Sequence, residues 1–531
     1  MIDDELESYN YVHKGVVHMK ARKVMMVMLM LVLSVSVVLA GCSSNNNQTQ
    51  PETPKNTENQ AAGGEQKSEE PVVLKYLSIE DNFDPAEDHT KKLIEEILGY
   101  DIVSSMGNSP DKVNLILTSN QEYDMISMSA KNRNALGTYI RNGAILPLND
   151  LIDAHGSRLK EVFPQEVWDM VSSDGKIYAL PTTNYTAVTE GIVIRGDWLE
   201  ALNLEVPTTV DEFYNVLKQF KEQDPGNVGS KLIPFAIPGS STWLDANGLA
   251  QAFGLGKNPL KLVEKDGSII SGMQAPGLKD YLGFLNKLYS EKLLDQDFPI
   301  MRTDNTVQKL GAGQLGAATL SAWDSGALKA LQAANPEANL IFLPALKDAN
   351  GNQSIENTGG LYQFLMVPTS SKKADEVVKY ANAFLDPANY SRLILGEENV
   401  SYKIEDGKYY PIFPEFDKFN KGRFFYPVNE SEMYTPLFGA RARKEKEMGE
   451  MWDDVTAKNN SLSYSDIVNF APMMPALEKH GSELDVLVKD RMIKMVLDDS
   501  ELAKLDELVK EWGEKGGTAI VDEYNAWYAA R

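Results

Sequence analysis

IVIRGDWLEALNLEVPTTVDEFYNVLKQF, residues 192–220, is the stretch from which the fold class can be inferred. Its apolar start, Ile192–Ile194, predicts a short buried strand. Thr209, with Glu212 three positions later, has the capping-box pattern that begins a helix. Apolar residues then recur at helical spacing, and these are Phe213, Val216, Leu217 and Phe220. A strand followed by an amphipathic helix is the unit from which α/β proteins are built.

The same alternation extends on both sides of this stretch. Five further apolar runs predict strands, and these are Val72–Ile79, Val113–Leu117, Met125–Met128, Ala317–Leu320 and Phe364–Val367. Near the C-terminus, apolar stripes over 502–512 and 520–528 predict two helices separated by a glycine-rich interruption at 513–517. Residues 71–531 are more than one hydrophobic core usually encloses, so we expect two lobes with a cleft between them.

A single cysteine, Cys42, follows a long apolar run near the N-terminus. Residues 24–40 carry no charge over 17 positions, and the basic residues Lys20, Arg22 and Lys23 precede them. This arrangement resembles a bacterial lipoprotein signal, in which cleavage occurs before the cysteine and its thiol takes lipid, palmitate included. The resemblance implies a chain anchored at the extracellular face of the cell membrane. We expect Met19 to be the initiator and residues 1–18 to be an over-extended start.

Residues 43–70 contain no Val, Ile, Leu, Met or aromatic residue. Such a segment cannot bury enough apolar surface to fold, which predicts a disordered tether. The remaining chain has no cysteine, so it can form neither disulfides nor a thiolate metal site. The net charge of -24 argues against a nucleic-acid partner, because such binding relies on clustered Lys and Arg.

Four motifs in order resemble one family. They are Leu146–Ile152, Asp174–Pro181, the run from Ile194 through Thr209 to Phe213, and Gly517–Tyr528. Together they resemble the family 1 solute-binding proteins of bacterial ABC importers, which capture sugars and oligosaccharides. The resemblance implies a two-lobed α/β fold of the type II periplasmic-binding-protein kind, which closes on a ligand by a hinge and then meets the permease subunits. It also implies a monomer.

The crossovers of such a fold make each lobe discontinuous in sequence. We expect a start and signal peptide at 1–41, a tether at 42–70, lobe 1 at 71–181, lobe 2 at 182–355, a return segment of lobe 1 at 356–425, and a return segment of lobe 2 with the C-terminal helices at 426–531.

A cleft that binds carbohydrate offers flat aromatic rings for stacking and short polar side chains for hydrogen bonds. Trp323 directly follows the predicted strand at 317–320, and Trp243 lies in the small, polar segment after the apolar run 233–237. Both are therefore expected at strand ends, where open α/β sheets bind ligands. Each of them could instead pack in a wall of the protein. The other candidates come from the crossovers and from the ends of the first strands, and they are Tyr185, Tyr362, Gly360, Asn82 and Ser129. Trp168, Trp198, Trp512 and Trp527 lie within or beside helical stripes, which predicts core positions.

Catalytic and cofactor signals are weak in this chain. Residues 311–316 match the dinucleotide glycine pattern but precede their strand, which argues against a cofactor site. The mature chain has three histidines far apart, His89, His155 and His480, so no zinc site or histidine triad is expected. Residues 224–229 correspond to a calcium loop in some relatives, but they lack its second carboxylate and terminal glutamate. We expect neither cofactor nor metal.

These observations favour a lipid-anchored protein that binds an oligosaccharide for an ABC importer and has no enzymatic activity. Two alternatives stay open. An exported polysaccharide-degrading enzyme would need two carboxylates about 5 to 10 Å apart across a cleft. A surface adhesin or sensory protein could use the same fold without a transporter.

Overall fold

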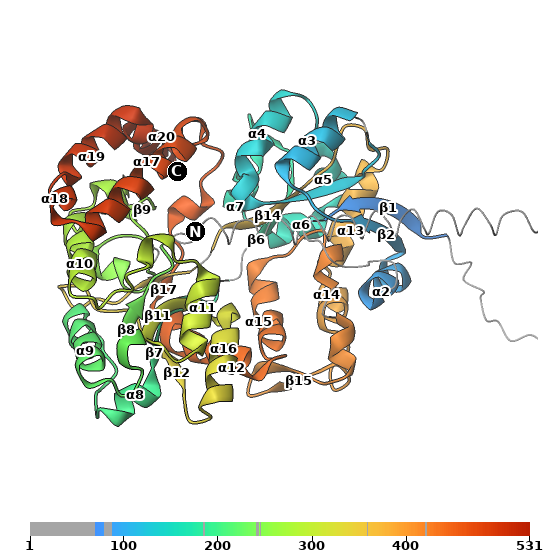
Figure 1. Ribbon diagram of the computed structural model, residues 1–531. Helices are drawn as coiled ribbons and strands as arrows, with labels where there is room; N and C mark the ends of the chain where they lie inside the picture. Colours follow the sequence, from blue (N-terminus) through green and yellow to red (C-terminus); the bar gives the residue numbers. More distant parts are fainter. Residues whose placement is uncertain are drawn as a thin grey trace, which may run out of the picture. The chain divides into compact units, whose positions relative to one another are not determined.

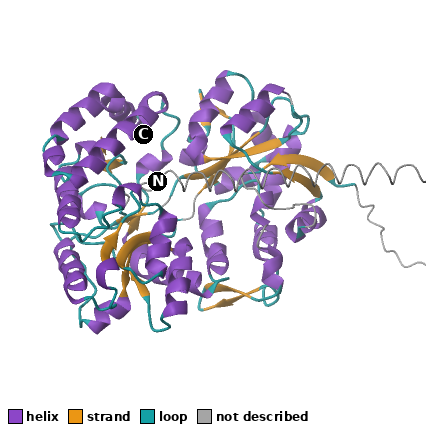
Figure 2. Ribbon diagram, viewed as in Figure 1, coloured by secondary structure: helices purple, strands orange, loops and turns teal. Residues whose placement is uncertain are grey.

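The computed structural model describes residues 70–78, 88–119, 121–183, 186–239, 244, 246–357, 359–419 and 422–531. These residues form a mixed α/β body with two principal sheets (Figures 1 and 2). Buried apolar side chains form one core against the first sheet and two clusters against the second. The predicted signal peptide, Cys42 and the predicted tether up to residue 69 lie outside the described residues. Within the described ranges, no helix has the length and apolar character that crossing a bilayer requires.

The first sheet has five strands in the order β2-β1-β3-β14-β6. Strand β1 pairs in parallel with β2 and β3, whereas β14 runs antiparallel to β3 and β6. The bounds are β1 Val72–Leu77, β2 Tyr100–Ser105, β3 Met125–Ser129, β6 Leu180–Thr183 and β14 Leu361–Met366. Strand β14 therefore comes from a part of the chain far from the others, which makes this lobe discontinuous.

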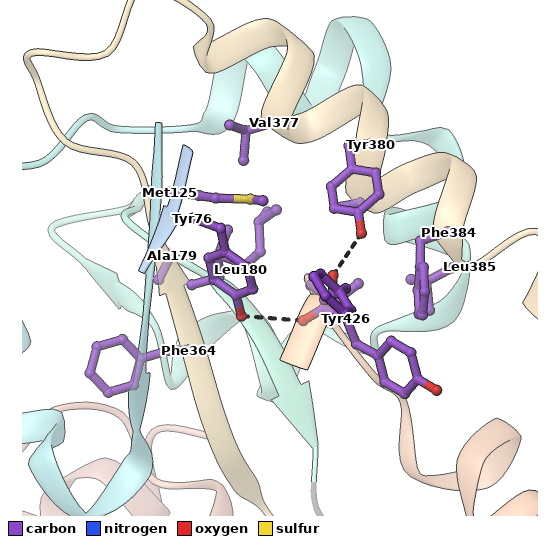
Figure 3. Close-up of a cluster of buried hydrophobic side chains, with 14 of the residues drawn as sticks. Tyr76, Met125, Ala179, Leu180, Phe364, Val377, Tyr380, Phe384, Leu385 and Tyr426 are labelled. Atoms are coloured by element: carbon purple, nitrogen blue, oxygen red, sulfur yellow. Dashed lines mark hydrogen bonds between the residues drawn. The ribbon is translucent and has the colours of Figure 1, made fainter. Parts of the chain in front are cut away.

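Apolar side chains between this sheet and its helices form the first core (Figure 3). Two buried tyrosines in it also donate hydrogen bonds: Tyr76 to the carbonyl of Tyr426 at 3.3 Å, and Tyr380 to the carbonyl of Phe425 at 2.6 Å. Both hydroxyls thus hold the segment at 425–426 against the sheet. The helices of this lobe are α2 His89–Leu98, α3 Pro110–Ser119, α4 Arg133–Arg141, α5 Asn149–His155, α6 Ser157–Val162, α7 Gln165–Asp169, α13 Ala374–Phe384, α14 Pro387–Leu395 and α15 Ser431–Ala442.

The second sheet has four strands in the order β12-β7-β11-β8. Strand β7 is antiparallel to β11 and β12, and β11 is parallel to β8. The bounds are β7 Glu190–Arg195, β8 Ile233–Ala236, β11 Leu315–Ser321 and β12 Leu340–Phe342. The helices around it are α8 Gly196–Ala201, α9 Val210–Gln223, α10 Leu278–Ser290, α11 Thr303–Gly311, α12 Gly326–Ala334 and α16 Lys446–Asn459.

The C-terminal helices pack on the core of the second sheet, close to α10 (Figure 1). They are α17 Pro475–Leu497, α18 Asp499–Leu502, α19 Leu505–Trp512 and α20 Thr518–Ala529. A kink at Gly513–Gly517 joins the last two, and Gly516 has φ 123°, where a Cβ would lie 2.3 Å from the ring of His480. The predicted glycine interruption between two helices is confirmed.

Short hairpins and bridges complete the described chain. The pairs are β4 Ser172–Ser173 with β5 Lys176–Ile177, β9 Leu262–Lys265 with β10 Ser268–Ser271, β15 Tyr402–Glu405 with β16 Lys408–Pro411, and β13 Ile355–Glu356 with β17 Ser463–Tyr464. Strands β13 and β17 pair in parallel where the chain crosses between the lobes. Ile355 of β13 packs in a core of the second sheet, and Leu361, a few residues later, packs in the core of the first sheet. The predicted domain boundaries stay a prediction.

One predicted strand is wrong. Residues 113–117 lie inside helix α3, which begins at Pro110. Val113 and Ile116 are buried and three positions apart, while Leu115 between them is 60% exposed, so the burial follows a helical period. By contrast, Trp168, Trp198 and Trp512 are buried as predicted, and Trp527 packs against the same core as Trp512.

Candidate functional site

The second sheet places a polar pocket at the carboxyl ends of β8 and β11. Because β7 is antiparallel to β11, its first residue lies at the same edge, and Glu190 pairs in register with Ser321. A cavity of about 230 Å³ opens there. The described residues that line it are Glu190, Gly191, Pro238, Asn247, Thr303, Thr319, Leu320, Ser321 and Asp324. This is the edge at which open α/β sheets bind ligands.

Asp324 is held in place by a local capping box. Its carboxylate accepts the N–H of Ser321 at 2.9 Å, and the hydroxyl of Ser321 accepts the N–H of Trp323 at 3.4 Å. These bonds fix the short helix η6, Ala322–Asp324, directly after β11. Burial raises the pKa of the Asp324 carboxyl, and the negative charge of Glu190 raises it further, whereas the bond from Ser321 lowers it. The carboxylates of Asp324 and Glu190 therefore repel each other electrostatically in this pocket.

The other polar side chains of the pocket differ in how many hydrogen bonds they make to the rest of the protein. Glu190 accepts a hydrogen bond from Lys257 Nζ at 3.0 Å. Asn247 donates to the carbonyl of Glu356 at 2.8 Å and accepts from Gln251 at 2.6 Å. Asn247 is thus part of a rigid wall, and Glu190 is an anion with a cation beside it.

Thr319 differs from both, because its hydroxyl has no hydrogen-bond partner among the described residues. The residue is only 9% exposed. An unpaired buried polar group costs about 1 to 3 kcal/mol. A ligand hydroxyl in the pocket could supply the missing hydrogen-bond partner. Binding of a polar ligand beside Thr319 would then remove the free-energy cost of the unpaired hydroxyl.

Trp323 lies next to this pocket and packs in an aromatic cluster. Its ring centroid is 5.1 Å from that of Phe438 and 5.3 Å from that of Trp452. The indole is partly buried against the core formed by β11, α12 and α16. Its predicted role in ligand stacking stays a prediction, but in this arrangement the ring also anchors η6.

The remaining predicted residues divide between two groups. Trp243, Tyr185 and Asn82 lie outside the described residues. Ser129 and Tyr362 belong to the first sheet, where β3 and β14 pair with Gln363 opposite Ser129, and Gly360 directly precedes β14. Their predicted contact with ligand stays a prediction.

The local structure of these three residues suggests different uses. Tyr362 is 45% exposed, which suits a stacking role. The hydroxyl of Ser129 accepts the N–H of Lys131 at 3.4 Å and so caps η1, Ala130–Asn132. Gly360 has φ 76°, and a Cβ there would lie 2.5 Å from the carbonyl of Asn469, so the backbone itself requires glycine.

A second cavity, of about 440 Å³, lies beside these residues. Its described lining comes from both lobes, and it comprises Ala130, Lys131, Arg133, Met170, Gly359, Leu361, Asn469, Leu477, Gly481, Ser482 and Asp485. Arg133 donates to the carbonyls of Ala471 and Pro472, at 2.9 and 3.2 Å. Its guanidinium is therefore used to join the lobes.

The comparisons with known proteins agree with this architecture. A family model described as bacterial extracellular solute-binding protein matches residues 91–415. The chain belongs to this family. Lipoprotein LipO of Bacillus subtilis (strain 168) is 24% identical over 522 residues, covering 92% of this chain and 96% of LipO. The polygalacturonan/rhamnogalacturonan-binding protein YtcQ of the same strain is 23% identical over 482 residues, covering 88% and 94%.

Among solved structures, this solute-binding chain is similar to the ABC-transporter substrate-binding protein FusA of Streptococcus pneumoniae in complex with kestose. The TM-score is 0.66 at 18% identity, over 86% of this chain and 99% of FusA. The similarity shows a shared fold, which is the two-lobed α/β fold that the sequence predicted. The family, YtcQ and FusA are each described as binding a solute or substrate.

The loop at 224–229, which was compared with a calcium loop on its sequence, is closed by the side chain of Asp224. Asp224 ends α9 in the left-handed conformation, with φ 43°. Its carboxylate oxygens accept the N–H groups of Val228 and Gly229, at 2.8 and 2.7 Å. Within the described part of the chain, no group of three His, Cys, Asp or Glu side chains is placed to hold a metal ion.

The residues that line the pocket at β11 were not predicted. Glu190, Thr319 and Asp324 have no unusual composition around them, although Ser321 and Asp324 show the same three-residue capping spacing as Thr209 and Glu212. That spacing after an apolar strand was the available signal for Asp324. Thr319 had none, because its lack of a partner is a property of the folded chain.

Proposed function

We propose that this protein captures an oligosaccharide at the pocket beside β11 and delivers it to the permease of an ABC importer. The observation that carries the proposal is the buried hydroxyl of Thr319, which has no partner among the described residues and lines a pocket with two carboxylates. Sugar hydroxyls both donate and accept hydrogen bonds, so they could serve Thr319 and the two carboxylates together. The descriptions of YtcQ and FusA support a carbohydrate as the ligand class.

We further propose that the protein acts as a monomer held at the extracellular face of the membrane by lipid on Cys42. The basic and apolar residues before Cys42 support this, as does the description of LipO as a lipoprotein. Ligand would bridge the two lobes and favour a closed state that the permease recognises. Tyr362 and Ser129 would meet the ligand from the first lobe, together with Trp243, Trp323 and Tyr185 from the second lobe and its crossovers.

The replacement of Thr319 by Val tests the proposal. Valine keeps the shape and removes a hydroxyl that has no partner in the protein, so the melting temperature without ligand should not fall. Binding should weaken by about 3- to 10-fold, which corresponds to one neutral hydrogen bond. Isothermal titration against a panel of neutral and acidic trisaccharides would measure both the ligand class and this effect.

Thr118→Val is the matched control, because Thr118 is exposed on α3 in the other lobe and its hydroxyl bonds only its own helix. This variant should bind like the wild type. A panel with no bound saccharide would contradict the carbohydrate assignment. Equal affinities for wild type and Thr319→Val would place the ligand elsewhere on the protein.

A further inference from the structure

We propose that the pocket beside β11 selects uncharged sugar rings and rejects uronic-acid sugars. This inference rests on the proposed function and adds the charge class of the cargo. The relatives alone do not decide it, because YtcQ is described as binding polygalacturonan and rhamnogalacturonan, while FusA was solved with the neutral sugar kestose. The side chains of this chain carry the argument.

The described lining of the pocket offers hydrogen-bond acceptors and hydroxyls, and no cationic side chain. Its charged members are Glu190 and Asp324. A site built for a carboxylate sugar would present arginine or lysine, since a guanidinium pairs with a carboxylate in a planar bidentate geometry. The cation beside the pocket, Lys257, is held by Glu190 at 3.0 Å. Its charge thus offsets an anion of the protein.

Thr319 gives the second, independent observation. Its buried hydroxyl lines the same pocket without a partner, so a ligand group is expected beside it. A ring hydroxyl there could bond Thr319 and donate to a neighbouring carboxylate. A ring carboxylate there would instead lie beside Asp324 and Glu190. For unit charges about 6 Å apart at an effective dielectric constant of about 20, the repulsion is on the order of a hundredfold in affinity.

The environment of Asp324 agrees with this picture. Its capping bond from Ser321 holds the carboxylate at the end of β11, so the side chain cannot easily turn away from a ligand. Its raised pKa, caused by burial and then by Glu190, shows that the site already disfavours one negative charge. A further anion brought by a ligand would be disfavoured for the same reasons.

Titration calorimetry with charge-matched saccharides tests the inference. The probes are trigalacturonate, its methyl ester, kestose, maltotriose, cellotriose and galactotriose. We expect a neutral probe to bind tightest to the wild type, and trigalacturonate to bind on the order of a hundredfold more weakly than its methyl ester. In Asp324→Asn, trigalacturonate should gain on the order of a hundredfold, because the repelling unit charge of Asp324 is removed and the charge of Glu190 is offset by Lys257.

The side chain introduced in Asp324→Asn can still accept the hydrogen bond from Ser321, and its melting temperature without ligand would verify that it folds. Glu200→Gln makes the same charge change at an exposed position on α8 and should leave the affinities for all probes unchanged. The charge inference would be overturned if the wild type bound trigalacturonate as tightly as its methyl ester. It would also be overturned if Asp324→Asn bound trigalacturonate no more tightly than the wild type does. Either result would leave the proposed function intact. Binding of none of the probes would overturn both.

Discussion

Asp324 has two tasks in one side chain. It caps η6 by accepting the Ser321 N–H at 2.9 Å, and it lines the pocket together with Glu190. The first task favours an ionised carboxylate, and burial in the pocket disfavours it. Burial prevails, because the pKa of Asp324 is raised from its ordinary value of 3.8. Keeping Asp324 ionised therefore lowers the free energy of unfolding of the protein. Such perturbed titratable groups are typical of functional sites.

This cost predicts a pH-dependent difference between wild type and Asp324→Asn. The folded-state pKa is raised, so above it the folded protein carries a charge that burial and Glu190 disfavour. As the pH falls through that pKa, the carboxyl takes up a proton and the penalty disappears. Without ligand, Asp324→Asn should therefore melt higher than wild type at pH 7, and the difference should narrow as the pH approaches 4.

Differential scanning fluorimetry between pH 4 and pH 7 would measure this difference. Glu200→Gln again serves as the control, since the charge it removes is exposed and its melting curve should follow the wild type at every pH. A difference that stays constant with pH would mean that the charge of Asp324 is not the cause.

Helices and strands could be predicted from the sequence where the pattern that specifies them lies within a few neighbouring residues. The capping box at Thr209 is confirmed, with Thr209 Oγ1 accepting the N–H of Glu212 at 3.2 Å and Glu212 accepting the N–H of Thr209 at 3.2 Å. The strand predicted at 113–117 is wrong because a short run with four apolar residues, interrupted by Asn114, fits a strand or a buried helix face equally well. Only Pro110 at the start and the exposed Leu115 in the middle distinguish the two.

The pocket depends on pairing between distant elements, which a single sequence does not reveal. Glu190 meets Ser321 because β7 pairs antiparallel with β11 across more than a hundred residues. The aromatic candidates were chosen by residue type, and Trp323 proves to pack against Phe438 and Trp452. Trp323 does lie at the end of β11, as predicted. The polar residues around it were not predicted, because residues of these types are common on any protein surface.

For the chain as a whole, the proposed anchor at Cys42 gives a direct prediction. Replacement of Cys42 by Ala removes the thiol that would take lipid, so the protein should leave the membrane fraction or accumulate as uncleaved precursor. One acyl chain binds a bilayer only marginally, so firm retention of the wild type would indicate more than one chain. Ser44→Ala is a suitable control, because it changes a neighbouring small residue and keeps the thiol.

Fractionation of cells followed by immunoblotting would distinguish Cys42→Ala from the wild type and from Ser44→Ala. Wild type and Ser44→Ala should be found with membranes, and Cys42→Ala should not reach the same mature form. If Cys42→Ala fractionates and migrates like the wild type, the chain is held by something other than lipid on this cysteine.

We propose that the sugar binds in the pocket beside β11. A crystal structure of the protein with the neutral trisaccharide that binds tightest in titration would test it most directly. We expect a sugar hydroxyl within hydrogen-bond distance of Thr319 Oγ1 and another donating to Asp324 or Glu190. A trisaccharide bound at a different place, with the hydroxyl of Thr319 still unpartnered, would show that this pocket is not the sugar site.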